Sequence, residues 1–436
     1  MEVRPMHNEF ALGVALFLVL LLGLSGCNLF KEPEQPIEAP TDPLSELILG
    51  NTTFAFNLYQ SLKAARENII FSPYSISLAM AMAYAGAKEE TEKQMQEVMH
   101  FTLPQEELHA TFHQLNYKLV TRGQGSGGGE SSPSKLNIAS SFWGQVGHPF
   151  LQEFLDTLEE NYGGVRFVDF AKAPENSRRL INEWVSEQTN GKIQDFLPPG
   201  SITPSIRVVL TTALYFSAKW IYQFYPQATF NEEFYLLDNR TVSVPMMHQC
   251  KVFRYAEDSD CQVIELLYGR PYDPQKPEEQ PLPEFSMVII LPQRGMFEKV
   301  EASLNGRRIT ELLKSLKDQK VLLTMPKFSY ECEYFLNEYL AALGMSDPFL
   351  QSKADFSGMD GARDIWLGDV RHKAFISVDE YGTEAAATTL ILLPTAPPPE
   401  KIKVMTINRP FVFLIRDLDT GTILFVGRVL DPTKSS

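Results

Sequence analysis

Apolar residues recur along residues 44–432 with two different periods, which predicts a chain that mixes helices and strands. Spacings of three and four residues predict helices at 54–62, 74–86, 91–99, 151–162 and 175–189. The first is expected to begin behind a cap at Asn51-Thr52-Thr53, and the second behind Ser72-Pro73. Nearly continuous apolar runs predict buried strands at 208–216 and 285–291, and a C-terminal hairpin at 411–415 and 422–429. No change of composition divides these residues, so we predict one α+β domain with a large sheet.

The N-terminal segment has the pattern of an export signal. Arg4 precedes an apolar run at Phe10–Leu24, which is too short for a confident membrane span. The run ends in Leu24-Ser25-Gly26-Cys27, which resembles the box of a bacterial lipoprotein precursor, whose cysteine is acylated after cleavage. An ordinary cleavage site beside an incidental cysteine is the alternative. The resemblance predicts a signal peptide at 1–26, lipid on Cys27, and a protein secreted across the cytoplasmic membrane and anchored at the cell envelope.

Residues 27–43 predict a flexible tether between this anchor and the folded part. Asn28–Pro43 contains four prolines and four acidic residues and has little that is apolar. Such a segment cannot bury enough apolar surface to order itself. We therefore expect the folded domain to occupy 44–436.

Composition limits the classes of partner. The formal net charge of -15 argues against nucleic acid or acidic lipid as the main ligand. A hydrophobic content of 44% is enough to form a large core.

One stretch after a predicted strand, Asp379–Pro399, has an unusual order of residues. Gly382 can act as a pivot, Thr383–Thr389 carries mostly small side chains, and Leu390–Leu393 has strand character. The prolines begin only at Pro394, so nothing before that residue prevents backbone pairing within a sheet. The 12 residues Gly382–Leu393 can therefore enter a sheet as a strand roughly 40 Å long, at about 3.3 Å per residue. An exposed linker or a short helix is the alternative.

No catalytic, cofactor or metal pattern emerges. The chain has no GxSxG, HExxH or P-loop motif, and a formal GxGxxG match in the loop 121–135 follows no strand. His109 and His113 have helical spacing but no third ligand, so we interpret them as packing or surface residues. With Cys27 assigned to lipid, Cys250 and Cys261 can pair with each other or remain ordinary thiols, as Cys332 can. We predict no enzyme activity, no cofactor and no metal.

Several motifs in one order resemble the serpin family over residues 45–432. They are Asn68-Ile69-Ile70-Phe71-Ser72-Pro73 with Ser75, Asn182-Glu183-Trp184-Val185, Ala213-Leu214-Tyr215-Phe216, Glu384-Ala385-Ala386-Ala387, Arg409-Pro410-Phe411 and Phe425-Val426-Gly427-Arg428. The resemblance implies helices around a large central mixed β-sheet with an exposed, insertable reactive loop. The chain departs from the family at three places: Thr212 replaces an asparagine, Ser217-Ala218 replaces Lys-Gly, and Tyr381 replaces a charged residue. The first departure puts the hydrogen bonding beneath the sheet in doubt.

The resemblance also implies a mechanism and its residues. A serpin is a suicide inhibitor: a protease forms an acyl-enzyme with the loop, and the cut loop then inserts into the sheet and distorts the protease. A non-inhibitory serpin that binds or chaperones other molecules is the alternative. The implied hinge residues are Glu380, Gly382, Thr383, Glu384, Ala385, Ala386, Ala387, Thr388 and Thr389. The implied residues of the region beneath the sheet, called the shutter in this family, are Ser72, Ser75 and His372.

Counting from Glu380 as the family does puts the attacked bond at Ala396–Pro397, and the adjacent Thr395–Ala396 bond avoids the proline. Leu392–Leu393 is a third choice, suited to a chymotrypsin-like enzyme. Because no arginine or lysine occurs at 382–400, we expect an elastase-like or subtilisin-like serine protease as partner, with a cysteine protease as a further option. We expect a monomer.

Overall fold

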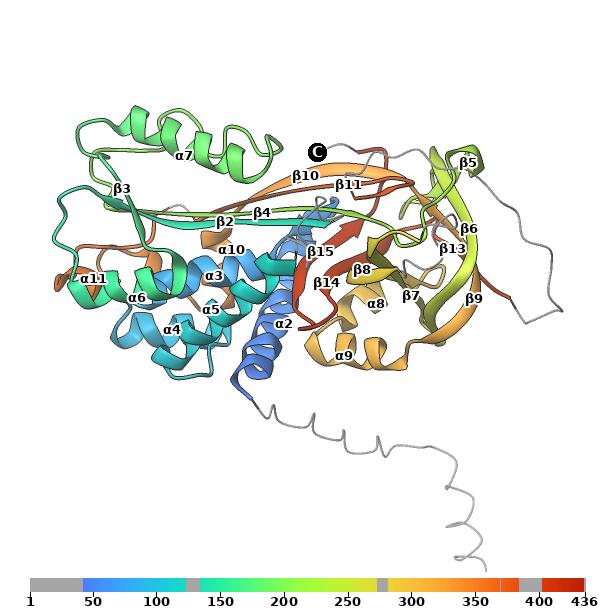
Figure 1. Cartoon of the computed structure of the whole chain (residues 1–436), viewed down its shortest axis with the longest axis horizontal. Coiled ribbons are helices and arrows are strands. Elements are labelled where there is room, and N and C mark those ends of the chain that lie inside the picture. The colour runs from blue at the N-terminus through green and yellow to red at the C-terminus, as the bar shows by residue number, and fades with distance from the viewer. Residues whose placement is uncertain (1–41, 123–133, 273–280, 369, 384–401, 435–436) are drawn as a thin grey trace, which may run out of the picture. The chain divides into compact units, whose positions relative to one another are not determined.

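The computed structural model describes residues 42–122, 134–272, 281–368, 370–383 and 402–434. Two β-sheets and a group of helices make up the fold (Figure 1). The helices are α2 (Pro43–Leu62), α3 (Pro73–Tyr84), α4 (Glu89–Met99), α5 (Gln105–Arg122), α6 (Gln152–Tyr162), α7 (Pro174–Gln188), α8 (Phe297–Ser303), α9 (Gly306–Ser315), α10 (Leu336–Leu343) and α11 (Ser357–Asp360), with short 3-10 helices at Lys63–Ala65, Pro226–Ala228 and Asp347–Phe349. None of the helices in these ranges has the length and apolar content needed to cross a membrane.

The predicted helices are confirmed except for the start of the first one. Helix α2 begins at Pro43, where the Asp42 side chain accepts a hydrogen bond from the Ser45 amide at 3.0 Å. The predicted cap residues lie inside α2 instead. The Thr52 and Thr53 hydroxyls donate to the carbonyls one turn earlier, at 2.8 and 2.9 Å, so these polar residues do not interrupt the helix.

The six-stranded sheet has the order β10-β11-β12-β4-β2-β3. Its strands are β2 (Ser134–Gln145), β3 (Val165–Val168), β4 (Val208–Lys219), β10 (Phe328–Phe335), β11 (Arg371–Val378) and β12 (Gly382–Thr383). Strand β4 contains the predicted run 208–216, and its residues 210–216 are all buried. Neighbours far apart in sequence, such as β4 and β11, are therefore brought together in one sheet.

The nine-stranded sheet has the order β1-β15-β14-β8-β7-β6-β9-β13, with β5 paired to β6. Its strands are β1 (Ile69–Phe71), β5 (Thr229–Tyr235), β6 (Thr241–Glu257), β7 (Cys261–Arg270), β8 (Leu282–Pro292), β9 (Lys317–Pro326), β13 (Lys403–Thr406), β14 (Phe411–Asp417) and β15 (Ile423–Val429). The predicted C-terminal hairpin is confirmed as β14 and β15, which pair antiparallel. The predicted α+β class with a large mixed sheet is confirmed, and the strands divide between two sheets.

The two faces of the six-stranded sheet are covered by different helices. Figure 1 shows α7 on one side of β2 and β4, and α3 on the other side. Every residue of α3 is buried, as its many small apolar residues predict. Helix α7 packs a smaller apolar cluster, including Ile181 and Val185, onto Ala139 and Ala213 of the sheet. The N-terminus of α3 lies against the sheet, where the Ser72 amide donates to His372 of β11 and the Ser75 carbonyl accepts from Ser140 of β2.

Candidate functional site

Strands β4 and β11 are separated at one end by β12. Gly382 and Thr383 pair antiparallel with Lys219 and Ala218 of β4. On its other side, Thr383 pairs with Val378 of β11. The first two residues after the turn therefore already occupy a strand position in the sheet. We call this end of the strand pair the wedge end.

At the other end the same two strands pair directly. Arg371, His372 and Lys373 of β11 lie beside residues 211–213 of β4, in parallel register. We call this end the seam. Any further strand between β4 and β11 would have to break this pairing.

Gly382 is required at the wedge end by geometry. Its φ angle is 149°, a value that residues with a side chain rarely adopt. A Cβ at this position would lie 2.0 Å from the Ala218 carbonyl oxygen, so the backbone of β12 approaches β4 too closely for any side chain. The predicted pivot is thus a residue that only glycine can fill in this arrangement.

Thr383 is buried in the wedge and hydrogen-bonded there. It is 2% exposed, and its hydroxyl lies 2.9 Å from the Tyr268 hydroxyl. The Trp220 ring stacks on Tyr268 with centroids 4.0 Å apart. Complete burial raises the pKa of Tyr268 well above its ordinary value, so this hydroxyl stays protonated.

The turn before the wedge is held mainly by backbone groups. The Asp379 carboxylate accepts hydrogen bonds from the amides of Tyr381 and Gly382, at 2.8 and 3.2 Å. The Trp220 amide donates to the Tyr381 carbonyl at 2.9 Å, and the Trp220 indole donates to the Asp379 carbonyl, also at 2.9 Å. Because Tyr381 contributes its backbone to these bonds, its departure from the family's usual charged residue leaves the turn intact.

Glu380 ties this turn to the nine-stranded sheet. One carboxylate oxygen accepts from the Lys327 ammonium at 2.7 Å, and the other accepts from the Thr229 hydroxyl at 2.8 Å. Burial of Glu380 favours the neutral acid, but Lys327, the Glu380 backbone amide and Thr229 together outweigh burial, so the pKa of Glu380 lies below its ordinary value. The predicted hinge glutamate is therefore charged and anchored.

His372 joins three elements at the seam. Its Nε2 accepts a hydrogen bond from the Ser72 amide at 2.9 Å, which assigns the ring proton of the neutral side chain to Nδ1. Nδ1 lies 2.8 Å from the Thr212 hydroxyl and 3.1 Å from the Thr212 carbonyl oxygen. Complete burial lowers the pKa of His372 to about 4. The ring is neutral at pH 7 and links β11, β4 and α3.

The serines beneath the seam extend this network. The Ser72 hydroxyl caps α3 by accepting from the Ser75 amide at 3.2 Å. The Ser140 hydroxyl of β2 donates to the Ser75 carbonyl, also at 3.2 Å. The structure thus brings Ser72, Ser75 and His372 together. It also answers the doubt about Thr212, whose hydroxyl and carbonyl both lie within hydrogen-bonding distance of the histidine.

Other predicted residues lie outside the described ranges. They are hinge residues Glu384, Ala385, Ala386, Ala387, Thr388 and Thr389, the candidate bonds at Leu392–Leu393, Thr395–Ala396 and Ala396–Pro397, the signal at 1–26 and Cys27.

Sequence reasoning missed the partners of the wedge: Thr229, Lys327 and Tyr268. They come from separate strands or connections, and no local spacing relates them to Glu380 or Thr383. Glu380 needs a cation because the fold buries it, and the sequence shows neither that burial nor which lysine or arginine lies beside it.

The three described cysteines form no disulfide, His109 is a buried packing residue, and His113 is exposed. Cys250, Cys261 and Cys332 are all free thiols, so the alternative of a Cys250–Cys261 disulfide is wrong. Burial raises the pKa of Cys261 to about 12, which makes it an unreactive thiol. His109 is buried, with Nδ1 2.7 Å from the Tyr162 hydroxyl.

Comparison with known proteins gives one consistent family. A sequence profile described as serpin (serine protease inhibitor) matches residues 49–432. A serpin-like protein of Thermococcus kodakarensis is 38% identical over 443 residues, covering 96% of this chain and 98% of the relative. Human leukocyte elastase inhibitor is 37% identical over 407 residues, covering 89% of this chain and 100% of the inhibitor.

Solved structures agree. The native state of tengpin, a thermophilic serpin, matches with a TM-score of 0.76 and 29% identity, covering 91% of this chain and 96% of tengpin. Human thyroxine-binding globulin matches with a TM-score of 0.75 and 28% identity, covering 90% of this chain and 100% of the globulin.

The prediction of no enzyme activity needs a correction. It was drawn from the lack of catalytic motifs, and a lack of motifs does not show which functional class a protein belongs to. The class comes instead from the match to a family described as protease inhibitors, and the comparisons show no enzyme family.

Proposed function

Because this chain belongs to the serpin family, we propose that it is a suicide inhibitor of a serine endopeptidase. A protease cleaves the segment after Thr383, is held as the acyl-enzyme, and is distorted when the segment enters the sheet between β4 and β11. The observation that carries this proposal is β12, which already pairs with β4 through both of its residues and with β11 through Thr383.

Continuing the β12 register gives the positions of an inserted strand. Paired residues on β12 and β4 have numbers that add to 601, since 382 pairs with 219 and 383 with 218. On this register Thr389 lies opposite Thr212, because 601 minus 389 is 212. On the β11 side, six residues beyond the Thr383–Val378 pair, Thr389 lies opposite His372. Insertion past Ala387 therefore requires the seam to open.

Insertion is strongly favourable by this account. About ten further residues that pair on both sides form on the order of 20 hydrogen bonds, worth roughly 20 kcal/mol gross at about 1 kcal/mol each. Ordering the segment reduces this gain. The uncleaved protein is then held by a kinetic barrier, which includes breaking the seam.

The small residues around the predicted bonds support an elastase-like or subtilisin-like target, cleaving at Thr395–Ala396 or Ala396–Pro397. The similarity to human leukocyte elastase inhibitor supports the same class. Mass spectrometry of the peptide released from a covalent complex identifies the bond. A cut before Ile391 would refute all three candidate bonds.

A lipid on Cys27 would hold the inhibitor at the cell envelope, with residues 28–41, before the cap of α2, as spacer. The Leu24–Cys27 box after the apolar run supports this location. Cys27→Ala should move the protein from the membrane fraction to the soluble fraction. A wholly membrane-bound variant would count against lipidation.

The mechanism itself is tested with the full-length chain and pancreatic elastase. We expect a complex that survives a denaturing gel, and a large rise in melting temperature after the loop is cleaved. Cleavage without a complex and without a rise in melting temperature would favour the alternative, a non-inhibitory serpin that acts as a binding or chaperone-like protein.

A further inference from the structure

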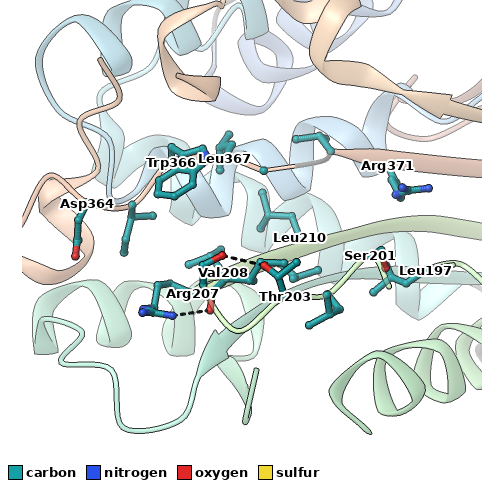
Figure 2. A pocket seen from close by; sticks show the side chains of 17 residues that line it. Leu197, Ser201, Thr203, Arg207, Val208, Leu210, Asp364, Trp366, Leu367 and Arg371 are labelled. Atoms are coloured by element: carbon teal, nitrogen blue, oxygen red, sulfur yellow. Dashed lines mark hydrogen bonds between the residues drawn. The ribbon is translucent and has the colours of Figure 1, made fainter. Parts of the chain in front are cut away.

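A cavity of about 260 Å³ lies at the start of β4 and β11, next to the seam. One wall is formed by residues 208–210 of β4 and the loop 201–207 that precedes it. The facing wall is formed by the loop 364–368 and by Val370 and Arg371. Figure 2 shows Trp366 and Leu367 on one side of this space, and Val208 and Thr203 on the other. The cavity is thus bounded by the two strands that pair at the seam.

The side chains that line the cavity are mainly apolar, and its arginines are already engaged. Arg371 lies 3.2 Å from Glu333, and its guanidinium lies 4.1 Å from the centroid of the Phe335 ring. Arg207 donates to the carbonyls of Pro204 and Ile206, at 3.0 and 3.1 Å. An anionic ligand would lose its hydration here, and Arg371 is already paired with Glu333. A cationic ligand would gain little from Asp364, the carboxylate of the lining, because that residue is exposed and screened by water. The lining therefore favours an uncharged molecule.

Ser201 supplies a polar feature of this lining. Its hydroxyl oxygen is buried and has no hydrogen-bond partner among the described residues. A ligand hydroxyl that reaches this oxygen would supply its missing hydrogen-bond partner. The cavity also exceeds the roughly 150 Å³ engineered cavity that accepts benzene. Two fused rings bearing one hydroxyl suit this volume and this lining.

We propose that the cavity binds a small uncharged aromatic alcohol of the naphthol class, and that the bound molecule holds β4 and β11 together against loop insertion. The second part rests on the proposed function. On the register of β12, residues 390–393 would lie opposite 211–208, because each pair adds to 601. Insertion to that depth separates the two walls. A ligand that contacts both walls therefore binds the uninserted form in preference to the inserted one.

The size of the effect follows from linkage. If insertion requires an empty cavity, a ligand slows it by a factor of 1 + [L]/Kd, which is about tenfold at ten times Kd.

Binding is tested by calorimetry of 2-naphthol with the intact full-length chain. We expect one saturable site that prefers 2-naphthol to naphthalene and to 2-naphthoate. Ile206→Trp, which fills the cavity, should weaken binding at least tenfold. The matched control Val404→Trp, at a site 58% exposed on the nine-stranded sheet, should leave it unchanged.

Ser201→Ala removes the unsatisfied hydroxyl and adds no bulk. It should abolish the preference for 2-naphthol over naphthalene, and this test decides the matter if Ile206→Trp does not fold. No saturable binding, or binding that neither variant changes, would overturn the proposed site.

Coupling is tested by cleaving the loop and following over time the fraction of chains that melt at the higher temperature, with and without saturating 2-naphthol. An unchanged rate despite binding would overturn the clamping role. If naphthol binds but cleavage never raises the melting temperature, the site stands and the proposed inhibitory function fails.

Discussion

The wedge end and the seam are formed by the same two strands, but different interactions hold them. At the wedge end, backbone pairing of β12 separates β4 from β11, and Glu380 anchors the turn to Lys327 and to Thr229 of β5. At the seam, the strands pair directly and His372 joins them to α3. In the proposed mechanism, the wedge end is therefore where the inserting strand enters, and the seam is where the two strands must still separate.

This difference shows how a sheet can stay open at one end without opening throughout. The wedge requires a glycine, since no side chain fits between β12 and β4 at Gly382. The seam depends on a neutral histidine, because a proton on Nε2 would face the Ser72 N–H instead of accepting from it. Changes at the wedge should therefore alter inhibition, and changes at the seam should alter stability and its pH dependence.

The largest effect is expected from Thr383→Arg at the wedge. Thr383 is 2% exposed, so the variant must either bury an unpaired guanidinium, at a cost of several kcal/mol, or expel β12 from the sheet. We expect the protease to cleave the loop and escape, so the chain becomes a substrate. Densitometry of denaturing gels measures the covalent complex.

Thr383→Ser is the matched control, because it keeps the hydroxyl that lies beside Tyr268. It should form the complex at nearly the original yield. A covalent complex with Thr383→Arg at the original stoichiometry would contradict the insertion of this position.

The next effect is loss of stability in acid. An unfolded histidine has a pKa near 6.5, whereas burial lowers the pKa of His372 to about 4. Between these values the unfolded chain binds a proton that the folded chain does not, so the free energy of unfolding falls as pH falls from about 6.5 to about 4. The slope is about 1.4 kcal/mol per pH unit for one such histidine.

Urea unfolding at pH 7 and pH 5 measures this slope. His109, whose pKa burial also lowers to about 4, contributes in the same direction, so the comparison requires a variant. His372→Asn should have a shallower pH dependence than the original chain. An equally steep dependence in that variant would assign the effect to other groups.

The predictions for Thr383 and His372 use residue positions that the sequence could supply and contacts that only the structure supplies. The places of Gly382, Thr383 and His372 in the sheet were predictable, because serpin motifs put these residues at recognisable positions. Helix α2 was predicted with the wrong start, because Thr52 and Thr53 resemble caps although their hydroxyls bond within the helix. The partners of Glu380 were not predictable, since the pairing of distant strands decides which lysine reaches it.

A smaller effect is expected for the ion pair at the wedge. The Lys327 ammonium lies 2.7 Å from Glu380, whose side chain is 7% exposed, but the lysine side chain is 37% exposed and partly screened by water. A double-mutant cycle with Glu380→Gln and Lys327→Met should give a coupling of about 1–2 kcal/mol.

The control cycle uses the pair Arg66–Glu298, at 3.3 Å, whose side chains are 78% and 74% exposed. That pair should give a coupling near zero, at most about 0.5 kcal/mol. Equal coupling in the two cycles would mean that burial of Glu380 adds nothing.

The smallest effect concerns the Thr212 hydroxyl at the seam. Thr212→Val keeps the shape of the side chain and removes the oxygen 2.8 Å from His372 Nδ1. The Thr212 carbonyl oxygen, at 3.1 Å, remains as an acceptor, so we expect a loss of only about 0.5–1 kcal/mol in urea unfolding. Thr211→Val is the control, because the Thr211 hydroxyl contacts Trp143 and Ser141 and not His372. Proton NMR of the His372 ring should show a moved Nδ1–H resonance in Thr212→Val and an unchanged one in Thr211→Val. A loss above about 3 kcal/mol for Thr212→Val would show that the hydroxyl, and not the carbonyl, is the main acceptor holding the seam closed.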